Sequence, residues 1–316
     1  MRYILSCVLS LAFSPAFALT PEDIETATFN GAKMPEGQSG LAVKLQVLLD
    51  RVGISPGVVD GYNGEMTASA LRGFEERQGL TIDGILDVEV WTALIGNDIR
   101  PILATYSISP EDVADLTQSI PENVAEKAKL EKLGYLRVTE RLAERFHMDE
   151  DFLKALNPAA TFEAGESIWV AAPGDRLEAE VARIEIRKSE RRAVAFDAEG
   201  RMVSNYPVAI GSAATPSPEG VVEVVAIAMD PTYSYLPDTN FVVDGVTDSL
   251  ILPAGPNGPV GSVWIDLSKP TYGLHGTDTP AGLFQVVSRG CVRFTNWDIE
   301  ELAHLVKPGV TVEFLE

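Results

Sequence analysis

Two different hydrophobic periods divide the chain. Between residues 41 and 95, apolar residues recur three and four positions apart, as in Leu41, Leu45, Leu48 and Leu49, and this spacing predicts amphipathic helices. From Arg183 onward, apolar and polar residues alternate in short β-rich runs, which is typical of strands. The pattern therefore predicts a multidomain α+β protein, with helices in its N-terminal part and a β-rich sandwich in its C-terminal part.

The helical region contains a short internal repeat. Each of two amphipathic stretches ends in an Asp-Gly turn, at residues 60–61 and 83–84, and a third stretch carries Val90, Trp91 and Leu94. We therefore predict a compact three-helix module over residues 41–96.

The region from Tyr106 to Pro173 is interrupted by several prolines. Within it, Glu140–Phe146 and the apolar residues around Leu153 and Leu156 predict two short helices. Apolar alternation at Tyr135–Val138 and Ser167–Val170 predicts an edge strand on either side of them. A small βααβ module with a preceding connector is expected over residues 106–174.

The C-terminal region, residues 180–316, supplies the predicted sandwich. Pro253–Gly261 is too rich in proline and glycine for a strand interior and predicts a loop near the candidate site. Residues 298–306 predict an amphipathic helix, and residues 309–314 a last strand that closes the sheet. The other predicted strands are Ala182–Ile186, Ala193–Phe196, Val203–Ile210 and Val221–Ile227.

The first 18 residues differ from the rest. One cation is followed by an apolar run and by Ala16-Phe17-Ala18, a pattern typical of a secretory signal peptide and too short for a membrane span. Residues 19–40 are then expected to be a linker. Cleavage after Ala18 would remove Cys7 and leave Cys291 as the single cysteine in an oxidising compartment, and an unpaired cysteine there indicates a reactive thiol.

Charge and residue inventory exclude several classes of function. The formal net charge of −21 argues against nucleic-acid partners and anionic membranes, both of which need clustered Lys and Arg. One mature cysteine and three scattered histidines supply no zinc set, and no phosphate-binding or dinucleotide fingerprint is present. We expect no metal and no cofactor.

The stretch Tyr272–Asp298 concentrates the candidate chemistry. A thiol acts as a nucleophile in its thiolate form, so Cys291 needs a nearby base, and His275 is the histidine placed to serve it. Either residue alone is usually a structural one. Gly276 and Gly290 beside them are not explained by core packing, and backbone amides of glycine turns can receive an oxyanion.

The motif His275-Gly276-Thr277, followed by Ser288-Arg289-Gly290-Cys291-Val292-Arg293, resembles the signature of the L,D-transpeptidase (YkuD-type) family. The resemblance covers roughly residues 180–316. It implies that Cys291 is a nucleophile, His275 a general base, Gly276 a carbonyl that orients the histidine, and Gly290 an oxyanion donor. It also implies the reaction: a peptidoglycan tetrapeptide stem loses its terminal D-alanine, and its acyl group passes through a thioester to an acceptor amine.

Further residues are candidates for substrate binding. Many members of the family carry histidine where Arg289 stands, and arginine cannot act as a base. Arg289 would lower the thiol pKa or pair with a substrate carboxylate; Arg293 would do the latter or form a structural ion pair. Ser288 is expected to orient the turn. Trp264 and Tyr272 complete the predicted substrate-binding set.

The N-terminal modules carry weaker resemblances. Residues 41–96 resemble the common peptidoglycan-binding helical domain, and residues 106–174 look like a degenerate LysM module that lacks the usual Gly-Asp of its first loop. Each either binds the wall or acts as a spacer. We interpret His147 as a surface residue and His304 as a helix-capping one.

We therefore expect a secreted, periplasmic, wall-associated cysteine transpeptidase whose partners are peptidoglycan stem peptides and glycan. Two alternatives stay open: an enzyme of the same thioester chemistry that transfers to water or to a protein amine, and a non-catalytic wall-binding protein.

Overall fold

The computed structural model describes residues 19–96, 98–237 and 246–316, so the predicted signal peptide lies outside the described residues. The first part of the chain is helical: α1 (Pro21–Glu25), α2 (Gly40–Arg51), α3 (Glu65–Gln78) and α4 (Val88–Ile95). Ser39 caps α2 and Asp87 caps α4 through their side-chain oxygens, while α3 ends at Gly79 in the left-handed conformation. We call α2 to α4 the helical module.

The segment predicted as a linker, residues 19–40, contains α1 and packs against α2. Thr20 and Asp23 form a capping box at the start of α1, and Ile24 is completely buried. The Lys44 ammonium donates to the carbonyl oxygens of Glu25 and Ala27 at 2.8 and 3.0 Å. Burial and hydrogen bonds thus tie this segment to the helical module.

The next region, which we call the middle module (residues 103–171), has a two-stranded antiparallel sheet. Strand β1 (Leu103–Ser107) pairs with β2 (Ser167–Ala171), and α7 (Val138–Arg145) and α8 (Glu150–Leu156) lie between them in the chain. An excursion carrying α5 (Pro110–Val113) and α6 (Val124–Lys127) separates β1 from α7. The two helices predicted for this region are confirmed.

The strand predicted at Tyr135–Val138 is wrong. Residues 135–137 are irregular, Val138 begins α7, and the partner of β2 is the earlier segment Leu103–Ser107. The amide of Leu136 donates to the carboxylate of Glu140 at 2.8 Å, and the hydroxyl of Tyr135 donates to Glu144. This segment is fixed by side chains of α7 and not by a strand ladder.

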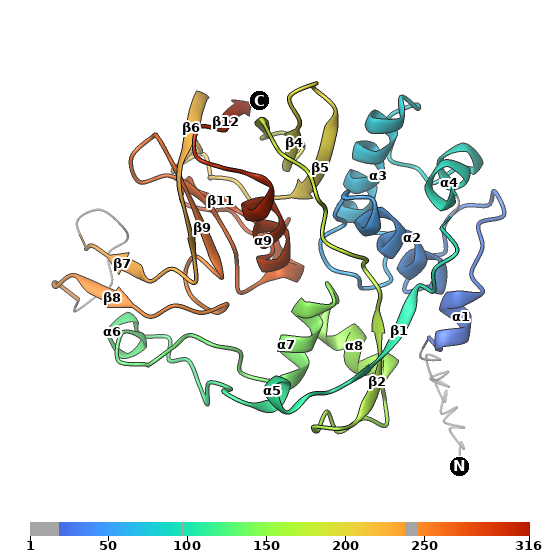
Figure 1. Cartoon of the computed structure of the whole chain (residues 1–316), viewed down its shortest axis with the longest axis horizontal. Coiled ribbons are helices and arrows are strands. Elements are labelled where there is room, and N and C mark those ends of the chain that lie inside the picture. The colour runs from blue at the N-terminus through green and yellow to red at the C-terminus, as the bar shows by residue number, and fades with distance from the viewer. Residues whose placement is uncertain (1–18, 97, 238–245) are drawn as a thin grey trace, which may run out of the picture.

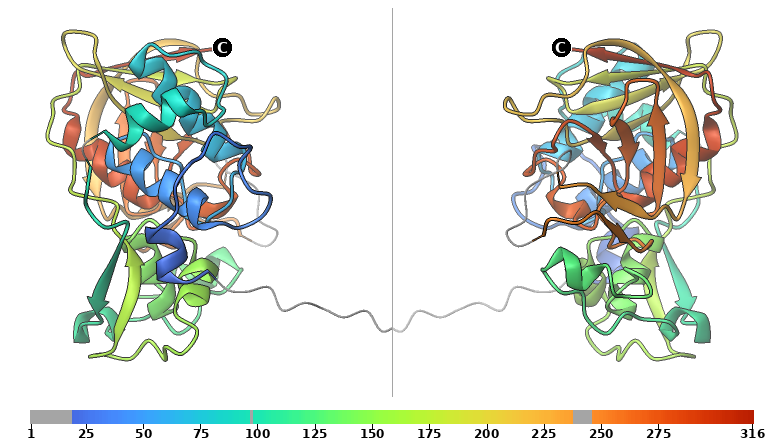
Figure 2. Two further views of the ribbon diagram at one scale, coloured as in Figure 1. Left: turned by 90° about the vertical axis from the view of Figure 1, so that its right-hand side faces the viewer. Right: turned by 90° about the vertical axis from the view of Figure 1, so that its left-hand side faces the viewer.

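The middle module and the helical module share one hydrophobic cluster. Buried residues from α1, α2, α3 and α4 are continuous with buried residues of β1, α7, α8 and β2. Leu49 and Leu153 are both completely buried in it. Figure 1 and Figure 2 show the middle module below the other two parts of the molecule, in contact with α1.

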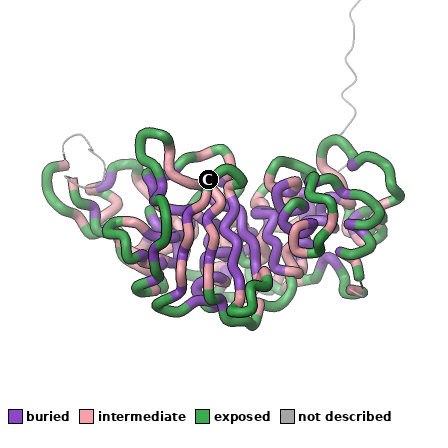
Figure 3. The backbone as a smooth tube through the Cα atoms, turned by 90° about the horizontal axis from the view of Figure 1, so that it is seen from above, coloured by how far each residue is buried: buried purple, intermediate pink, exposed green. Residues whose placement is uncertain are grey.

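The C-terminal part, which we call the sheet domain (residues 181–315), is built on one eight-stranded sheet with the order β11-β10-β9-β6-β12-β3-β4-β5. Helix α9 (Asn296–Leu305) packs against β9 and β10, and β7 (Tyr233–Tyr235) and β8 (Leu250–Leu252) form a separate hairpin. The sheet's strands are β3 (Arg183–Arg187), β4 (Arg192–Phe196), β5 (Met202–Pro207), β6 (Gly220–Met229), β9 (Val263–Leu267), β10 (Gly273–His275), β11 (Val292–Arg293) and β12 (Thr311–Leu315). Figure 3 shows buried residues gathered along neighbouring strands of the sheet and exposed ones along the loops, whereas most of β6 is exposed.

The sheet curls until its two ends meet. Beyond β5, Ala209 exchanges two backbone hydrogen bonds of 2.9 Å with Arg293 of β11, and the Ser288 amide donates to the Ile210 carbonyl at 2.7 Å. The last strand, β12, is inserted between β6 and β3 in the middle of the sheet. This architecture confirms the predicted fold class, a multidomain α+β protein with a β-rich C-terminal domain.

The helical module also docks onto the sheet domain. The Ser55 amide donates to the carbonyl of Asn205 in β5 at 2.9 Å, and Arg187 of β3 pairs with Glu76 of α3 at 2.6 Å. A Cβ on Gly73 would lie 2.4 Å from Nδ2 of Asn205, so the helix approaches the strand at a distance that requires glycine.

Candidate active site

The two residues with nucleophile and base chemistry lie on neighbouring strands. Strand β10 pairs in parallel with β11, with Leu274 opposite Val292 and His275 opposite Arg293. Extending this register by one residue places Cys291 opposite Gly273. Residues that lie opposite each other on paired strands, and residues two apart in one strand, point to the same face of a sheet. Cys291, opposite Gly273, therefore projects from the same face as His275, which lies two residues after Gly273.

The imidazole of His275 is buried, with 4% of its surface exposed. Its Nδ1 lies 2.7 Å from the carbonyl oxygen of Gly276. A carbonyl oxygen accepts only, so Nδ1 carries the hydrogen and Nε2 keeps a free lone pair. Trp264 stacks on the ring at 5.7 Å between centroids. Burial lowers the pKa of His275 to about 4, so the ring is neutral at pH 7.

The Cys291 side chain is partly exposed, and its thiol lies 3.7 Å from the carbonyl oxygen of Thr271. Burial raises the pKa of this thiol above its ordinary value, against the opposing effects of the Gly273 amide and the Arg293 charge, which lower it. The resting site therefore holds a neutral thiol and a neutral imidazole, and a proton must pass to Nε2 when the thiolate forms.

Ser288 holds the turn before the cysteine. Its hydroxyl donates to the Cys291 carbonyl and accepts from the Gly290 amide at 3.0 Å. Gly290 has φ +114°, and a Cβ there would lie 2.7 Å from the ring of Tyr272. The Gly290 amide is thus engaged by Ser288 in this state, and it becomes available to an oxyanion only if that bond is exchanged.

The two predicted aromatic residues pack against the site's glycines. The indole of Trp264 covers Gly273, where a Cβ would be 2.4 Å from the ring, and its Nε1 donates to Asp266 at 3.2 Å. Tyr272 lies against Gly290, with the Lys269 ammonium 5.1 Å from its ring centroid. Trp264 therefore borders His275, and Tyr272 borders the turn that precedes Cys291.

Arg289 is exposed and Arg293 is half-buried on β11. Sequence reasoning did not single out Tyr233 of β7, a half-buried residue that interacts electrostatically with Cys291, Arg289 and Arg293. Burial raises the pKa of Tyr233; Cys291 in its thiolate form adds to this effect, and the charges of Arg289 and Arg293 oppose it. No local motif marks this tyrosine, because a separate hairpin brings it to the site.

The other two histidines lie away from Cys291. His304 in the last turn of α9 lies 2.7 Å from the Glu300 carbonyl, in agreement with the interpretation as a helix-capping residue. The interpretation of His147 as a surface residue is wrong. It pairs with Asp50 of α2 at 2.9 Å and stacks on Trp297 of α9 at 5.3 Å, so it joins all three parts of the molecule.

Comparisons with known proteins place this site in a family. Residues 181–314 match the model of the L,D-transpeptidase catalytic domain. A Bacillus licheniformis protein with the provisional name L,D-transpeptidase YkuD is 32% identical over 177 residues, which cover 55% of this chain and 90% of that protein. The chain belongs to the L,D-transpeptidase family.

Other L,D-transpeptidase relatives match over a smaller share of their length. The Bacillus subtilis YkuD protein is 30% identical over 121 residues, covering 38% of this chain and 58% of that protein. The Escherichia coli protein named as the probable L,D-transpeptidase ErfK/SrfK is 29% identical over 136 residues, covering 42% and 44%. A solved L,D-transpeptidase from Mycobacterium smegmatis has a TM-score of 0.36 at 14% identity over 48% of this chain and 64% of its own, a similarity too low to carry an argument.

The helical module has its own match, since residues 39–94 fit a model with the provisional description of a peptidoglycan-binding domain. The described residues hold no group of three or more His, Cys, Asp or Glu side chains able to bind a metal ion. Among the same residues, no helix is both long and apolar enough for a membrane span.

Proposed function

We propose that this chain is a cysteine L,D-transpeptidase of peptidoglycan, with Cys291 as nucleophile and His275 as general base. The observation that supports the proposal is the pairing of β10 with β11, whose register, extended by one residue, puts Cys291 on the face from which the neutral imidazole of His275 projects. Membership of the L,D-transpeptidase family supports the same reaction.

In the first half of the cycle, Nε2 of His275 takes the proton of the Cys291 thiol, and the sulfur attacks the carbonyl carbon between the third residue of a stem tetrapeptide and its terminal D-alanine. The tetrahedral intermediate collapses, the C–N bond breaks, and His275 returns the proton to the leaving amine. Gly276 keeps the imidazole oriented through its carbonyl oxygen.

In the second half, an acceptor amine attacks the thioester and transfers a proton to His275. The C–S bond breaks, and the thiolate takes that proton back. A backbone donor to the oxyanion contributes about 3 kcal/mol in comparable enzymes. We assign that role to amides around Gly290 and Cys291, which requires the Gly290 amide to leave Ser288 when the substrate binds.

We assign Arg289, Arg293, Trp264 and Tyr272, which lie near His275 or in the turn that carries Cys291, to the donor stem. The two arginines would hold its carboxylates, and the two aromatic rings would contact its apolar parts. The helical module, by its match to peptidoglycan-binding domains, is the part we assign to wall attachment. The protein would act outside the cytoplasm, where its substrate lies.

The test is to incubate residues 19–316 with synthetic tetrapeptide stems and to detect the acyl-enzyme by mass spectrometry. We expect an adduct equal to the stem minus D-alanine in the wild type, and none in Cys291→Ala or His275→Gln. Identical spectra for the wild type and Cys291→Ala would refute the proposal. Cross-linked dimers, tripeptides or protein conjugates among the products would distinguish transfer, hydrolysis and protein anchoring, and sacculus binding without thiol reactivity would favour a non-catalytic protein.

A further inference from the structure

The middle module contacts the sheet domain next to the histidine. The Leu133 amide donates to the Ala254 carbonyl at 2.8 Å, and the Asn257 amide donates back to the Leu133 carbonyl at 3.0 Å. The side chain of Asn257 donates to the Glu140 carboxylate at 2.6 Å. A Cβ on Gly255 would lie 2.2 Å from the Leu133 carbonyl oxygen. These contacts fix residues 253–261, the loop that leads into β9.

At the end of this loop, Asn296 lies against the backbone around His275. Its Oδ1 accepts from the Ser262 amide at 3.2 Å. A Cβ built on Gly261 or Gly276 would lie 2.2 or 2.1 Å from the same oxygen. The Gly276 amide donates to the Val260 carbonyl at 3.1 Å, so the loop and the residue after His275 are held together as one unit.

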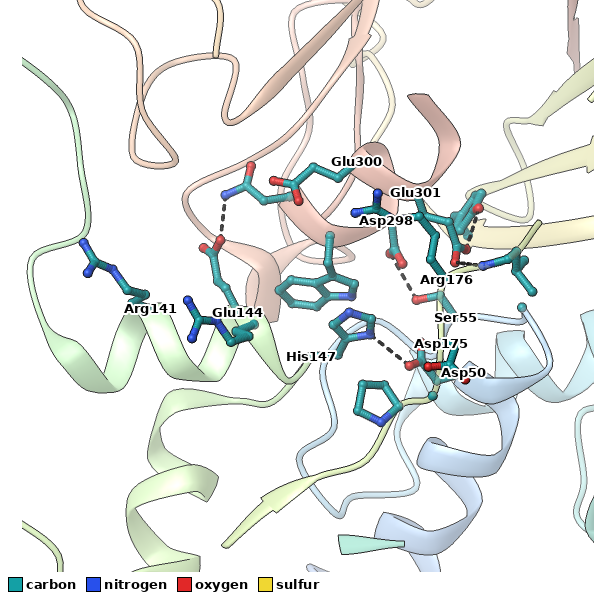
Figure 4. Close-up of a pocket in the computed structure, with 18 of the residues that line it drawn as sticks. Asp50, Ser55, Arg141, Glu144, His147, Asp175, Arg176, Asp298, Glu300 and Glu301 are labelled. Carbon is teal, nitrogen blue, oxygen red and sulfur yellow. Dashed lines mark hydrogen bonds and ion pairs between the residues drawn. The ribbon is translucent and has the colours of Figure 1, made fainter. Parts of the chain in front are cut away.

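The middle module supplies the partner on the other side of Asn296. Its Nδ2 donates to Oε2 of Glu144 at 2.9 Å and to the Pro256 carbonyl at 3.3 Å. Oε2 of Glu144 also accepts from the hydroxyl of Tyr135 at 3.1 Å. Figure 4 shows Glu144 reaching from α7 toward α9. Glu144 is one of the residues that line a cavity of about 470 Å³ between the three parts of the molecule.

A buried carboxyl group such as that of Glu144 is unfavourable at a position where only packing is required. The Glu144 side chain is 8% exposed, and burial raises its pKa to about 8, so the carboxyl group is mostly neutral at pH 7. An apolar residue would fill the same space without a buried carboxyl group. What only a polar acceptor supplies is the orientation of the Asn296 amide, whose other end holds Ser262 and faces Gly276.

We propose that Glu144 of the middle module is a positioning residue for His275, acting through Asn296 on the Gly261–Ser262 and Gly276 backbone. The Gly276 carbonyl oxygen accepts the hydrogen bond from Nδ1–H of His275. The direction of this carbonyl therefore sets the tautomer and the angle of the imidazole ring. The middle module would thus be a working part of the active site, whether or not it binds glycan. The proposal rests on the proposed function in taking His275 as the base.

The test compares three variants. Glu144→Met fills a similar volume without the strong acceptor, and Glu144→Gln keeps an acceptor oxygen for Asn296 and Tyr135. Glu150→Met is the matched control, because the ion pairs of Glu150 with Arg137 and Lys154 stay within the middle module. Each is assayed for kcat and KM with a tetrapeptide donor. The pKa of His275 is measured by NMR titration, with its signal assigned by His275→Gln.

We expect Glu144→Met to lower kcat roughly 10- to 100-fold with little change in KM, as expected for a misplaced catalytic group. We also expect it to lower the pKa of His275 further, because the hydrogen bond to the Gly276 carbonyl, which opposes the effect of burial, is weakened. Glu144→Gln should restore both quantities. The proposal would be overturned if Glu144→Met kept the wild-type kcat and the wild-type pKa of His275, or if Glu150→Met lost as much kcat as Glu144→Met. It would also be overturned if Glu144→Gln did not restore kcat and the pKa of His275.

The two proposals fail in different ways. If the wild type does not turn over any stem peptide while the pKa of His275 still responds to Glu144→Met and not to Glu150→Met, the proposed reaction is wrong and the positioning holds. If turnover is normal in all three variants and the pKa of His275 does not move, the reaction stands and the positioning is refuted.

Discussion

The segment Tyr272–Arg293 and the junction around Glu144 contain similar kinds of residue, but they are organised in different ways. In the first, His275, Gly276, Ser288, Gly290 and Cys291 lie within 17 positions of sequence, and two short parallel strands bring them together. In the second, Asp50, Glu144, His147, Asn296 and Asp298 come from three parts of the chain and meet only on docking.

The comparison shows that the reacting groups can lie close together in the sequence while the residues that orient them come from distant parts of the chain. The reacting groups depend on local glycines that allow close approach of the backbone, as at Gly273 under Trp264. Their orientation depends on contacts more than 100 residues apart, such as that of Asn296 with Glu144. Changes in the first region should therefore act on turnover directly, and changes in the second should act through geometry and pH.

The largest effect is expected where the two regions touch. Gly276→Ala would place a Cβ 2.1 Å from Oδ1 of Asn296, so the turn after His275 must move. We expect at least about a 100-fold loss of kcat, from steady-state assays with a tetrapeptide donor, because the carbonyl that orients the imidazole shifts with it.

Gly64→Ala is the matched control, since a Cβ there meets nothing within 4 Å. Adding Asn296→Ala to Gly276→Ala removes the clash but also the positioning contact, so it should restore stability more than turnover. Full activity in Gly276→Ala alone would show that the turn tolerates displacement and would weaken both proposals.

Sequence reasoning identified the local region because its signals are local. The alternation of β3 to β6, the helix α9 and the His275 and Cys291 motif all lie in short windows. It placed a strand at Tyr135–Val138, where alternating polarity instead reflects Leu136 and Tyr135 bound by side chains of α7. It interpreted His147 as exposed, because its partners Asp50 and Trp297 are 97 and 150 positions away in the sequence.

The junction should also give the protein a pH-dependent stability. The pKa of Glu144 is about 8 in the folded state, above the ordinary 4.5, and that of Asp298 is about 7 against 3.8. Burial is the main cause for both. A carboxyl group with a raised pKa binds its proton more tightly when folded, so its contribution is complete below the ordinary pKa and is lost as pH rises through the folded one. The contribution of these two carboxyl groups to stability should therefore fall between pH 5 and 8.

Glu144→Gln removes only the contribution of Glu144 to this pH dependence. Asp298, Glu301 and His147, whose pKa values are also raised, still contribute in the variant. We expect urea unfolding to give similar free energies for the wild type and Glu144→Gln at pH 5. At pH 8.5 the variant should be more stable by roughly 2 to 4 kcal/mol, which is the free energy that the wild type loses when the buried Glu144 ionises. Parallel pH curves for the two proteins would mean that Glu144 ionises as freely in the folded state as in the unfolded one.

The smallest effect is expected at Tyr233, which lies at the border of the local region but comes from the β7–β8 hairpin. Tyr233 interacts electrostatically with Cys291, Arg289 and Arg293, and we predict that its hydroxyl donates to a carboxylate or carbonyl of the bound stem. Tyr233→Phe removes one such neutral hydrogen bond, so kcat/KM for a tetrapeptide donor should fall about three- to tenfold with unfolding unchanged. Tyr62→Phe, on the exposed surface of the helical module, should leave kcat/KM unchanged and serves as the control. Equal values for the two variants would assign Tyr233 to packing of the hairpin alone, and the active site would then be complete within the segment that carries its motif.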